Sequence, residues 1–208
     1  MNHPKVPRRP GSSLTASPGD VIQWTEPLIR VMRTQGRHVT AWDEFRHHGP
    51  LAGMRWEPHP AGPISHHPRH GVSYQGVDIA TCLAEVFQTT RCIDTHTGKP
   101  QIIMWTPTRP VPLLDVTGTW PIRQGASAAL MSAPRPVCTA WAQAIHHDLP
   151  QVEGIMTRST MTGNAVVVLF TAAASAFPAA PDHVVSLSSD IGVLLAHAAA
   201  VELGYALL

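Results

Sequence analysis

A single glutamate, Glu85, stands in a stretch of the sequence that otherwise has the pattern of a strand, a turn and a helix. Residues 71–87 read GVSYQGVDIATCLAEVF, and Asp78 is suited to cap the helix that follows it. The apolar residues of that helix recur at the spacing of one buried stripe: Ile79, Cys82, Leu83, Val86 and Phe87. Glu85 lies well off the centre of this stripe. Periodicity alone therefore predicts a solvated residue, although a carboxylate at this place could also act in acid–base chemistry.

Histidine is the other residue type that invites a chemical interpretation, because the chain contains 13 of them. Six of them form the adjacent pairs 47–48, 66–67 and 146–147, which is not the spacing that places two ligands on one helical face. No HExxH motif and no Cys/His finger spacing is present in the sequence. We therefore expect no metal site and interpret these residues as surface and loop histidines.

Sequence motifs that bind phosphate through the backbone are also missing. The sequence has no GxGxxG and no GxxxxGK[ST], which excludes the usual dinucleotide and P-loop cradles, and it has no GxSxG nucleophile elbow. A nucleotide, if one binds, must therefore be held by side chains.

Composition predicts a folded protein without an extreme partner preference. The chain has 208 residues, 44% of them hydrophobic and 14% charged, with a formal net charge of +1. This charge gives no reason to expect nucleic acid or an anionic membrane as the main partner. No window approaches the roughly 20 apolar residues that span a bilayer. The three cysteines form no CxxC pair and no signal peptide is recognisable, so we expect a cytoplasmic protein.

The sequence predicts one domain preceded by an arm. Residues 1–20 mix prolines with basic and small residues and show no apolar period, which predicts a flexible N-terminal arm. We expect the domain to occupy residues 21–208 and to begin with a short helix at residues 26–34. Arg55 precedes Trp56 and Pro58, a context that predicts a strand or a strand end.

The remaining pattern predicts an α+β fold, because strands and helices follow one another without a regular βαβ repeat. Strands are predicted at residues 71–75, 101–105, 111–116, 155–159 and 165–170, the last of them buried on both faces. Helices are predicted at residues 126–131 and 137–147, separated by prolines 134 and 136. A last helix is expected to start at Ser188 or Ser189 and to run to about Leu203.

An ordered set of short motifs resembles the RES domain family, named for its arginine, glutamate and serine. The set consists of RW at 55–56, GVSY at 71–74, AEVF at 84–87, GIMTRS at 154–159 and VLF at 168–170. The resemblance implies a fold similar to that of ADP-ribosyltransferase toxins, with mixed central sheets flanked by helices. It departs from the familiar pattern at Trp56, where phenylalanine is more usual, and in the His/Pro-rich segment 59–70. The sequence leaves open whether this segment narrows the cleft, selects a target or contacts a partner.

The resemblance also implies a function. RES proteins act on NAD⁺ as the toxin of a bacterial toxin–antitoxin pair, and their partner is a helix-turn-helix antitoxin. Some split NAD⁺ with inorganic phosphate into nicotinamide and ADP-ribose 1″-phosphate, so NAD⁺ and phosphate would be substrates and no separate cofactor is expected. The resemblance is compatible with a homodimer within the toxin–antitoxin complex. Two alternatives stay open: a mono-ADP-ribosyltransferase that modifies a bacterial protein, and a non-catalytic binding module with the same fold.

By this resemblance four residues are the candidate site. Glu85 would stabilise the positive charge that develops on the ribose, and Arg55 would bind the phosphates and support catalysis. Tyr74 would stack on nicotinamide, and Ser159 would hydrogen-bond the ribose or a phosphate. Each has a simpler interpretation as well: a solvated helix residue, a surface ion-pair partner, a half-buried strand aromatic and a strand-end hydroxyl.

Overall fold

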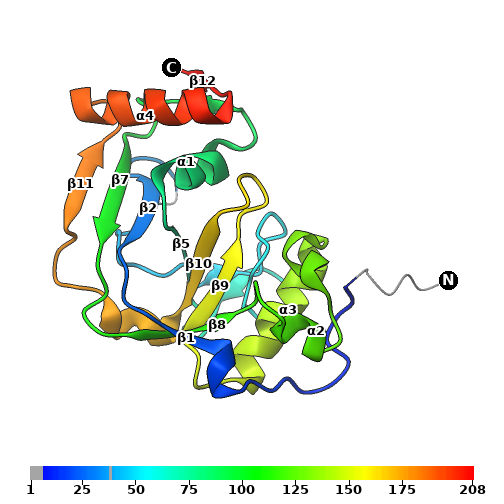
Figure 1. Ribbon diagram of the computed structural model, residues 1–208. Coiled ribbons are helices and arrows are strands. Elements are labelled where there is room, and N and C mark those ends of the chain that lie inside the picture. The colour runs from blue at the N-terminus through cyan, green and yellow to red at the C-terminus, as the bar shows by residue number, and fades with distance from the viewer. Residues whose placement is uncertain (1–6, 38) are drawn as a thin grey trace.

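The computed structural model describes residues 7–37 and 39–208, and its largest element is an eight-stranded sheet (Figure 1). The strand order is β1-β8-β9-β10-β5-β2-β7-β11. The strands are β1 Val21–Trp24, β2 Leu28–Arg33, β5 Val72–Gly76, β7 Pro100–Trp105, β8 Val111–Asp115, β9 Gly154–Arg158, β10 Ala165–Phe170 and β11 His183–Ser186. Neighbours pair antiparallel except β8 and β9, which are parallel. The sheet is therefore mixed, as the α+β prediction requires.

The sheet is weakly joined at its middle. Strands β2 and β5 share one register pair, Ile29 with Gly76, whereas β10 and β5 are in register over five pairs. The two halves, β1-β8-β9-β10-β5 and β2-β7-β11, therefore diverge on either side of this contact. Two small sheets accompany the large one, β3 His48–Gly49 with β4 Ser65–His66 and β6 Cys92–Ile93 with β12 Ala206–Leu207.

Helices cover one face of the sheet in two separate groups (Figure 1). Helices α1 Ile79–Phe87 and α4 Asp190–Leu203 pack on β2 and β7, and α2 Trp120–Arg123 and α3 Arg135–Asp148 pack on β8, β9 and β10. The opposite face is closed by a third cluster that includes Trp105, Leu113 and Val167 together with the 3₁₀ turn η3 Thr171–Ala176. The remaining 3₁₀ turns are η1 Pro18–Asp20 and η2 Ala128–Ser132. A space is left on the helical face where the two groups meet.

Most of the predicted elements are confirmed. Asp78 caps α1 by accepting a hydrogen bond from the Thr81 amide at 2.7 Å, and Ser189 caps α4 through the Gly192 amide at 3.1 Å. Helix α3 and strands β5, β7, β8, β9 and β10 lie within two residues of their predicted ends. No helix in the described ranges is long and apolar enough to cross a bilayer.

The predicted helix at residues 26–34 is wrong, because this segment forms the central strand β2. Leu28 and Ile29 point to opposite faces of the sheet and both are buried, since both faces are covered here. A strand covered on both faces loses the alternation that would have identified it. Two smaller corrections are that residues 128–132 form a 3₁₀ turn, not an α-helix, and that Arg55 lies in a bend, not in a strand.

The described part of the predicted N-terminal arm makes contacts with the domain. Residues 1–6 of the predicted arm lie outside the described residues, whereas residues 7–20 contact the domain. Leu14 is buried in the α3 cluster, and its amide donates to Asp148. The indole N–H groups of Trp120 and Trp141 donate to the carbonyls of Thr15 and Arg8. Residues 7–20 are therefore attached to the domain, where a flexible arm was expected.

Candidate functional site

A cavity of about 530 Å³ opens where the two helix groups meet over the β2–β5 junction. It is lined by β2, β5, β9, β10, α1 and the segment 53–56. All four residues predicted from the sequence, Arg55, Tyr74, Glu85 and Ser159, line it. The structure therefore brings together side chains that are up to 104 residues apart in the chain, since 159 − 55 = 104.

Glu85 and Ser159 are in direct contact. The Ser159 hydroxyl donates to Glu85 Oε1 at 2.6 Å, and it accepts hydrogen bonds from the amides of Met161 and Thr162 at 3.0 and 3.2 Å. One donor and two acceptor sites are all that a serine hydroxyl has. Ser159 is therefore saturated, and in this arrangement it orients the carboxylate and does not bind a further group.

The turn after β9 is fastened to the start of α1, which fixes this contact. The hydroxyls of Thr81 and Thr162 lie 2.8 Å apart, and Asn164 Nδ2 donates to the capping carboxylate of Asp78 at 3.2 Å. The same helix buries Leu83 and Phe87 on its inner face. A short rigid helix, anchored at its N-terminus and along one side, thus delivers Glu85 to the cavity.

Tyr74 lies on β5 opposite Val168 of β10, and its hydroxyl points into the protein. Burial raises the pKa of Tyr74, and the nearby Glu57 carboxylate raises it further, so the hydroxyl is neutral. The residue is only half-buried although its oxygen is fully buried. The exposed part of Tyr74 therefore excludes the hydroxyl, in agreement with a ring that faces the cavity.

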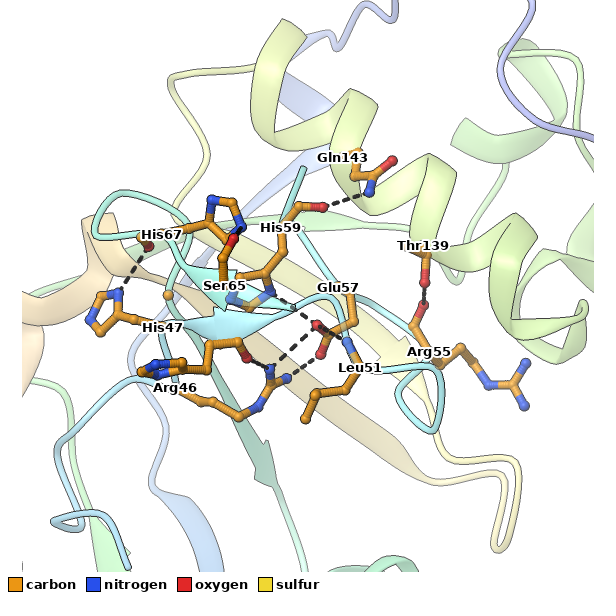
Figure 2. Close-up of polar contacts among 12 residues, drawn as sticks. Arg46, His47, Leu51, Arg55, Glu57, His59, Ser65, His67, Thr139 and Gln143 are labelled. Atoms are coloured by element: carbon orange, nitrogen blue, oxygen red, sulfur yellow. Dashed lines mark hydrogen bonds and ion pairs between the residues drawn. The ribbon is translucent and has the colours of Figure 1, made fainter. Parts of the chain in front are cut away.

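Arg55 lines the cavity near the start of α3. Its guanidinium donates to the Ala133 carbonyl and lies 3.7 Å from Cys138 Sγ, while its own carbonyl accepts from Thr139 at 3.3 Å. Figure 2 shows the side chain turned away from Glu57 and its partners. Part of its hydrogen-bonding capacity is already used by the protein.

Arg30 is a cavity residue that the sequence did not suggest. It lies on β2, and its guanidinium donates to the carbonyls of Trp42 at 2.8 Å and Glu44 at 3.1 Å. Burial lowers the pKa of Arg30, and the charges of Glu44 and Asp43 oppose that effect. The signal in the sequence was a single arginine inside the apolar run 28–32, and the helix prediction concealed it.

A buried charged group stands behind the cavity wall. Arg46 pairs with the carboxylate of Glu57 and donates to the His48 carbonyl, and His59 Nδ1 lies 2.9 Å from Glu57 Oε2 (Figure 2). Glu57 is completely buried, which opposes ionisation, but hydrogen bonds from His59, Arg46 and the Leu51 amide hold its pKa below the usual value. Arg46 itself lines the cavity. No local sequence pattern predicts this group of charged residues, because the loop segments that form it meet only after folding.

Positive charge dominates the lining of the cavity. Five arginines contribute to it, Arg30, Arg46, Arg55, Arg135 and Arg158, against the one carboxylate of Glu85. The whole chain has a net charge of only +1, so the cavity is far more basic than the protein. This lining suits a ligand that carries several negative charges and one developing positive charge near Glu85.

The histidine-rich segments lie beside this site and not within it. His70 and His146 stack with ring centroids 4.7 Å apart, and His67 follows at 5.9 Å from His70. Among the residues that the structure describes, no group of three or more His, Cys, Asp or Glu side chains is arranged to hold a metal ion.

Comparisons with known proteins identify a family and a similar fold. A family model described as the RES domain matches residues 27–190. A chain in the crystal structure of the M. tuberculosis MbcT–MbcA toxin–antitoxin complex has a similar fold, with a TM-score of 0.55 and 17% identity over 86% of this chain and 92% of that one. No protein among those with curated descriptions matches the sequence.

Proposed function

Because the chain belongs to the RES domain family, we propose that it is a toxin enzyme that cleaves NAD⁺ at the bond between nicotinamide and ribose. The observation that carries the proposal is the contact between Ser159 and Glu85, 2.6 Å long, in a cavity lined by five arginines. That combination supports the proposal, because it sets one oriented carboxylate among guanidinium groups whose chemistry suits phosphate.

The carboxylate of Glu85 has a defined task in this reaction. When the nicotinamide leaves, its nitrogen takes the bonding electrons and positive charge develops on the anomeric carbon of the ribose, as in glycoside cleavage. A carboxylate near this carbon stabilises the transition state more than the ground state. Ser159 holds the carboxylate in one orientation, so less reorganisation is needed as the charge develops.

The arginines would bind the diphosphate of NAD⁺. A planar guanidinium matches phosphate oxygens, and Arg55 retains N–H groups beyond the one that donates to Ala133. Arg30 also lines the cavity, although its guanidinium is bound to the carbonyls of Trp42 and Glu44. Tyr74 would offer its ring to the nicotinamide, while its neutral hydroxyl stays in the protein.

We propose inorganic phosphate as the second substrate. A phosphate oxygen would form a bond to the anomeric carbon as the bond to nicotinamide breaks, giving ADP-ribose 1″-phosphate. A mono-ADP-ribosyltransferase would use the same cavity and leaving group with a protein side chain as the nucleophile. The two reactions differ only in the attacking group, so the products distinguish them.

The physiological setting belongs to the same proposal. One similar fold is found in a toxin–antitoxin complex, which supports an antitoxin as the partner of this chain. The resemblance to RES proteins implies that this antitoxin is of the helix-turn-helix class. The protein would then work in the bacterial cytoplasm, where NAD⁺ is available, and the antitoxin would keep it inactive. A homodimer within the complex is compatible with this arrangement.

The test uses purified protein freed of any partner. NAD⁺ is supplied with and without inorganic phosphate, and nicotinamide and the ribose product are identified by mass spectrometry. Release of nicotinamide that requires phosphate, with ADP-ribose phosphate as the product, supports phosphorolysis. Transfer of labelled ADP-ribose to a protein supports the transferase, and stable NAD⁺ under all conditions leaves a non-catalytic binding module.

A further inference from the structure

Besides the Tyr74 hydroxyl, two buried hydrogen-bonding groups of the cavity lining have no partner among the described residues. They are the indole nitrogen Nε1 of Trp56 and the hydroxyl Oγ1 of Thr157. Both residues line the cavity, and they are only 2% and 1% exposed. Neither atom makes a hydrogen bond to any residue in the described ranges 7–37 and 39–208.

The strand register places Thr157 on the reactive side of the sheet. It lies on β9 two residues before Ser159, so both side chains point to the same face. Its register partner is Val166 on β10, which in turn lies opposite Gly76 on β5, and both of those residues line the cavity. The side chain of Thr157 is therefore the neighbour, on the same face of the sheet, of the serine that orients Glu85.

Trp56 reaches the same face from the other side. It follows Arg55 in the chain, and its ring packs in the cluster that contains Val72 and Val168 of the sheet. The hydroxyl of Tyr74 lies beside the Trp56 backbone and also lacks a hydrogen bond of regular geometry. Three of the seven buried side-chain atoms that lack a hydrogen bond of regular geometry in the described structure therefore belong to residues that line this cavity.

A buried donor without a partner costs about 1–3 kcal/mol, so folded proteins contain few of them. Two such groups in one wall are explained if the contents of the cavity satisfy them. An indole N–H can only donate, and therefore it requires an acceptor. An oxygen atom of the ligand, either in a carboxamide or in a phosphate, has this chemistry.

We propose that Trp56 and Thr157 are ligand-binding residues of this cavity that donate hydrogen bonds to oxygen atoms of the ligand. The inference rests on the proposed function, since it takes NAD⁺ as the ligand. It adds to the four candidate residues a pair of neutral donors. A few placed polar groups fix the orientation of a ligand in its pocket, and these donors would have that role.

The experiment removes the hydroxyl without changing the shape of the side chain. Thr157→Val is compared with Thr157→Ser, which keeps the hydroxyl, and Trp56→Phe removes the indole donor. Affinities are measured by calorimetry for two unreactive probes, nicotinamide and ADP-ribose, with Glu85 intact. NAD⁺ itself is measured in a Glu85→Gln background, where it should persist. Melting temperatures are recorded without ligand.

The expected result has two parts that a purely structural role would not produce together. Thr157→Val should weaken binding of one probe by about 5- to 20-fold, because a ligand acceptor loses its donor. Its melting temperature without ligand should stay the same or rise, because a buried group without a protein partner has been removed. Loss for nicotinamide would identify the carboxamide as the acceptor, and loss for ADP-ribose would identify a phosphate or ribose oxygen. Thr157→Ser should bind like the wild type.

Tyr205→Phe is the matched control, because the Tyr205 hydroxyl is also buried without a partner but lies outside the cavity. This variant should bind every probe like the wild type. Wild-type affinity in both Thr157→Val and Trp56→Phe would overturn the inference and leave the proposed function standing. A folded wild-type protein that binds none of the three compounds would overturn both.

Discussion

At the scale of single residues, the main feature of the candidate site is a serine hydroxyl that is hydrogen-bonded to a carboxylate. Ser159 donates its only proton to Glu85 and accepts two amide hydrogen bonds from the turn that follows it. Gln88 adds a contact to the second oxygen, Glu85 Oε2, at 3.4 Å. The Glu85 carboxylate is therefore held at both oxygens in one orientation. In the proposed reaction its negative charge stabilises the transition state, and Ser159 positions it.

The first prediction concerns that charge. Glu85→Gln keeps the size of the side chain and its hydrogen bond from Ser159, but it removes the negative charge that stabilises a cationic transition state. We expect the rate of nicotinamide release to fall by at least about 100-fold, with an unchanged melting curve. Glu202→Gln, an exposed change on α4, is the control and should retain full activity. Wild-type turnover in Glu85→Gln would remove Glu85 from the mechanism.

The second prediction follows from the stacked histidines. Burial lowers the pKa of His70 and of His146, and the neighbouring His67, His59 and Arg69 add to this effect for His70. The folded protein therefore binds fewer protons than the unfolded chain, whose histidines titrate near the ordinary value of about 6.5. Stability from these groups is present above that pH and is lost as the pH falls through it.

We accordingly expect the melting temperature to fall between pH 7.5 and pH 5.5, and the measurement is thermal unfolding at steps across this range. The double variant His70→Gln/His146→Gln should flatten this dependence, whatever its absolute stability. An equal slope in the double variant would show that other groups cause the loss. The carboxylates with lowered pKa values, such as Glu57, lose their contribution only at lower pH, so they do not interfere in this window.

At the scale of elements, the start of α4 is fixed by a glycine. A Cβ built at Gly192 would lie 1.9 Å from the carbonyl oxygen of Ser186 and 2.7 Å from the Cα of Leu187. The contacts are to backbone atoms of the link between β11 and α4, so no side chain can move aside. Glycine is required here by close packing of the helix on that link.

The third prediction uses this conflict between local preference and packing. A glycine-to-alanine change inside a helix normally stabilises a protein by about 1 kcal/mol. We expect Gly192→Ala to destabilise by about 2–3 kcal/mol instead, because the added methyl group collides with the backbone. Denaturant unfolding measures the difference. Gly19→Ala, which meets nothing within 4 Å, should change stability by no more than about 0.5 kcal/mol, and a stabilised Gly192→Ala would contradict the packing argument.

Elements whose own sequence carries both a cap and a period were predictable. Helix α1 has Asp78 and its apolar stripe, and α4 has Ser189. The resemblance to the RES domain family, which the motif at residues 84–87 in α1 helps to carry, was confirmed by the family match. Strand β2 was not predictable from its pattern, because burial on both faces and a helix-like run of apolar residues gave the wrong period. The same error hid Arg30.

For the candidate site, the sequence could indicate residues that belong to short motifs, but it could not indicate contacts that form only on folding. The sequence motifs placed Arg55, Tyr74, Glu85 and Ser159 on one list, and the structure brings them around one cavity. The sequence could not show that the hydrogen-bonding capacity of the Ser159 hydroxyl is already used, since this depends on the turn after β9 lying against α1. The group around Glu57 was missed for the same reason.

At the scale of the whole molecule, the cavity exists because the sheet is nearly divided. The single register pair between β2 and β5 lets the two halves diverge, and each half carries its own pair of helices. The basic lining of the cavity is balanced by acidic residues elsewhere, since the net charge is only +1. A local positive field in a nearly neutral protein attracts anions to the cavity, without non-specific binding of anions over the whole surface.

The last prediction tests that field. Arg135 and Arg158 are exposed cavity residues, so their charges are the most accessible to screening by salt. We expect kcat/KM for NAD⁺ to fall by about threefold to tenfold as sodium chloride rises from about 20 to 300 mM at constant phosphate, because a shorter screening length weakens the long-range attraction of the anion. Arg135→Gln/Arg158→Gln should lower kcat/KM at low salt and lose most of this dependence. It should leave kcat largely unchanged, because among the described residues neither arginine side chain forms a hydrogen bond or ion pair with Glu85 or Ser159. A salt response equal to that of the wild type in the double variant would mean that the buried arginines, not the exposed pair, create the attraction, since screening acts much less on charges removed from water.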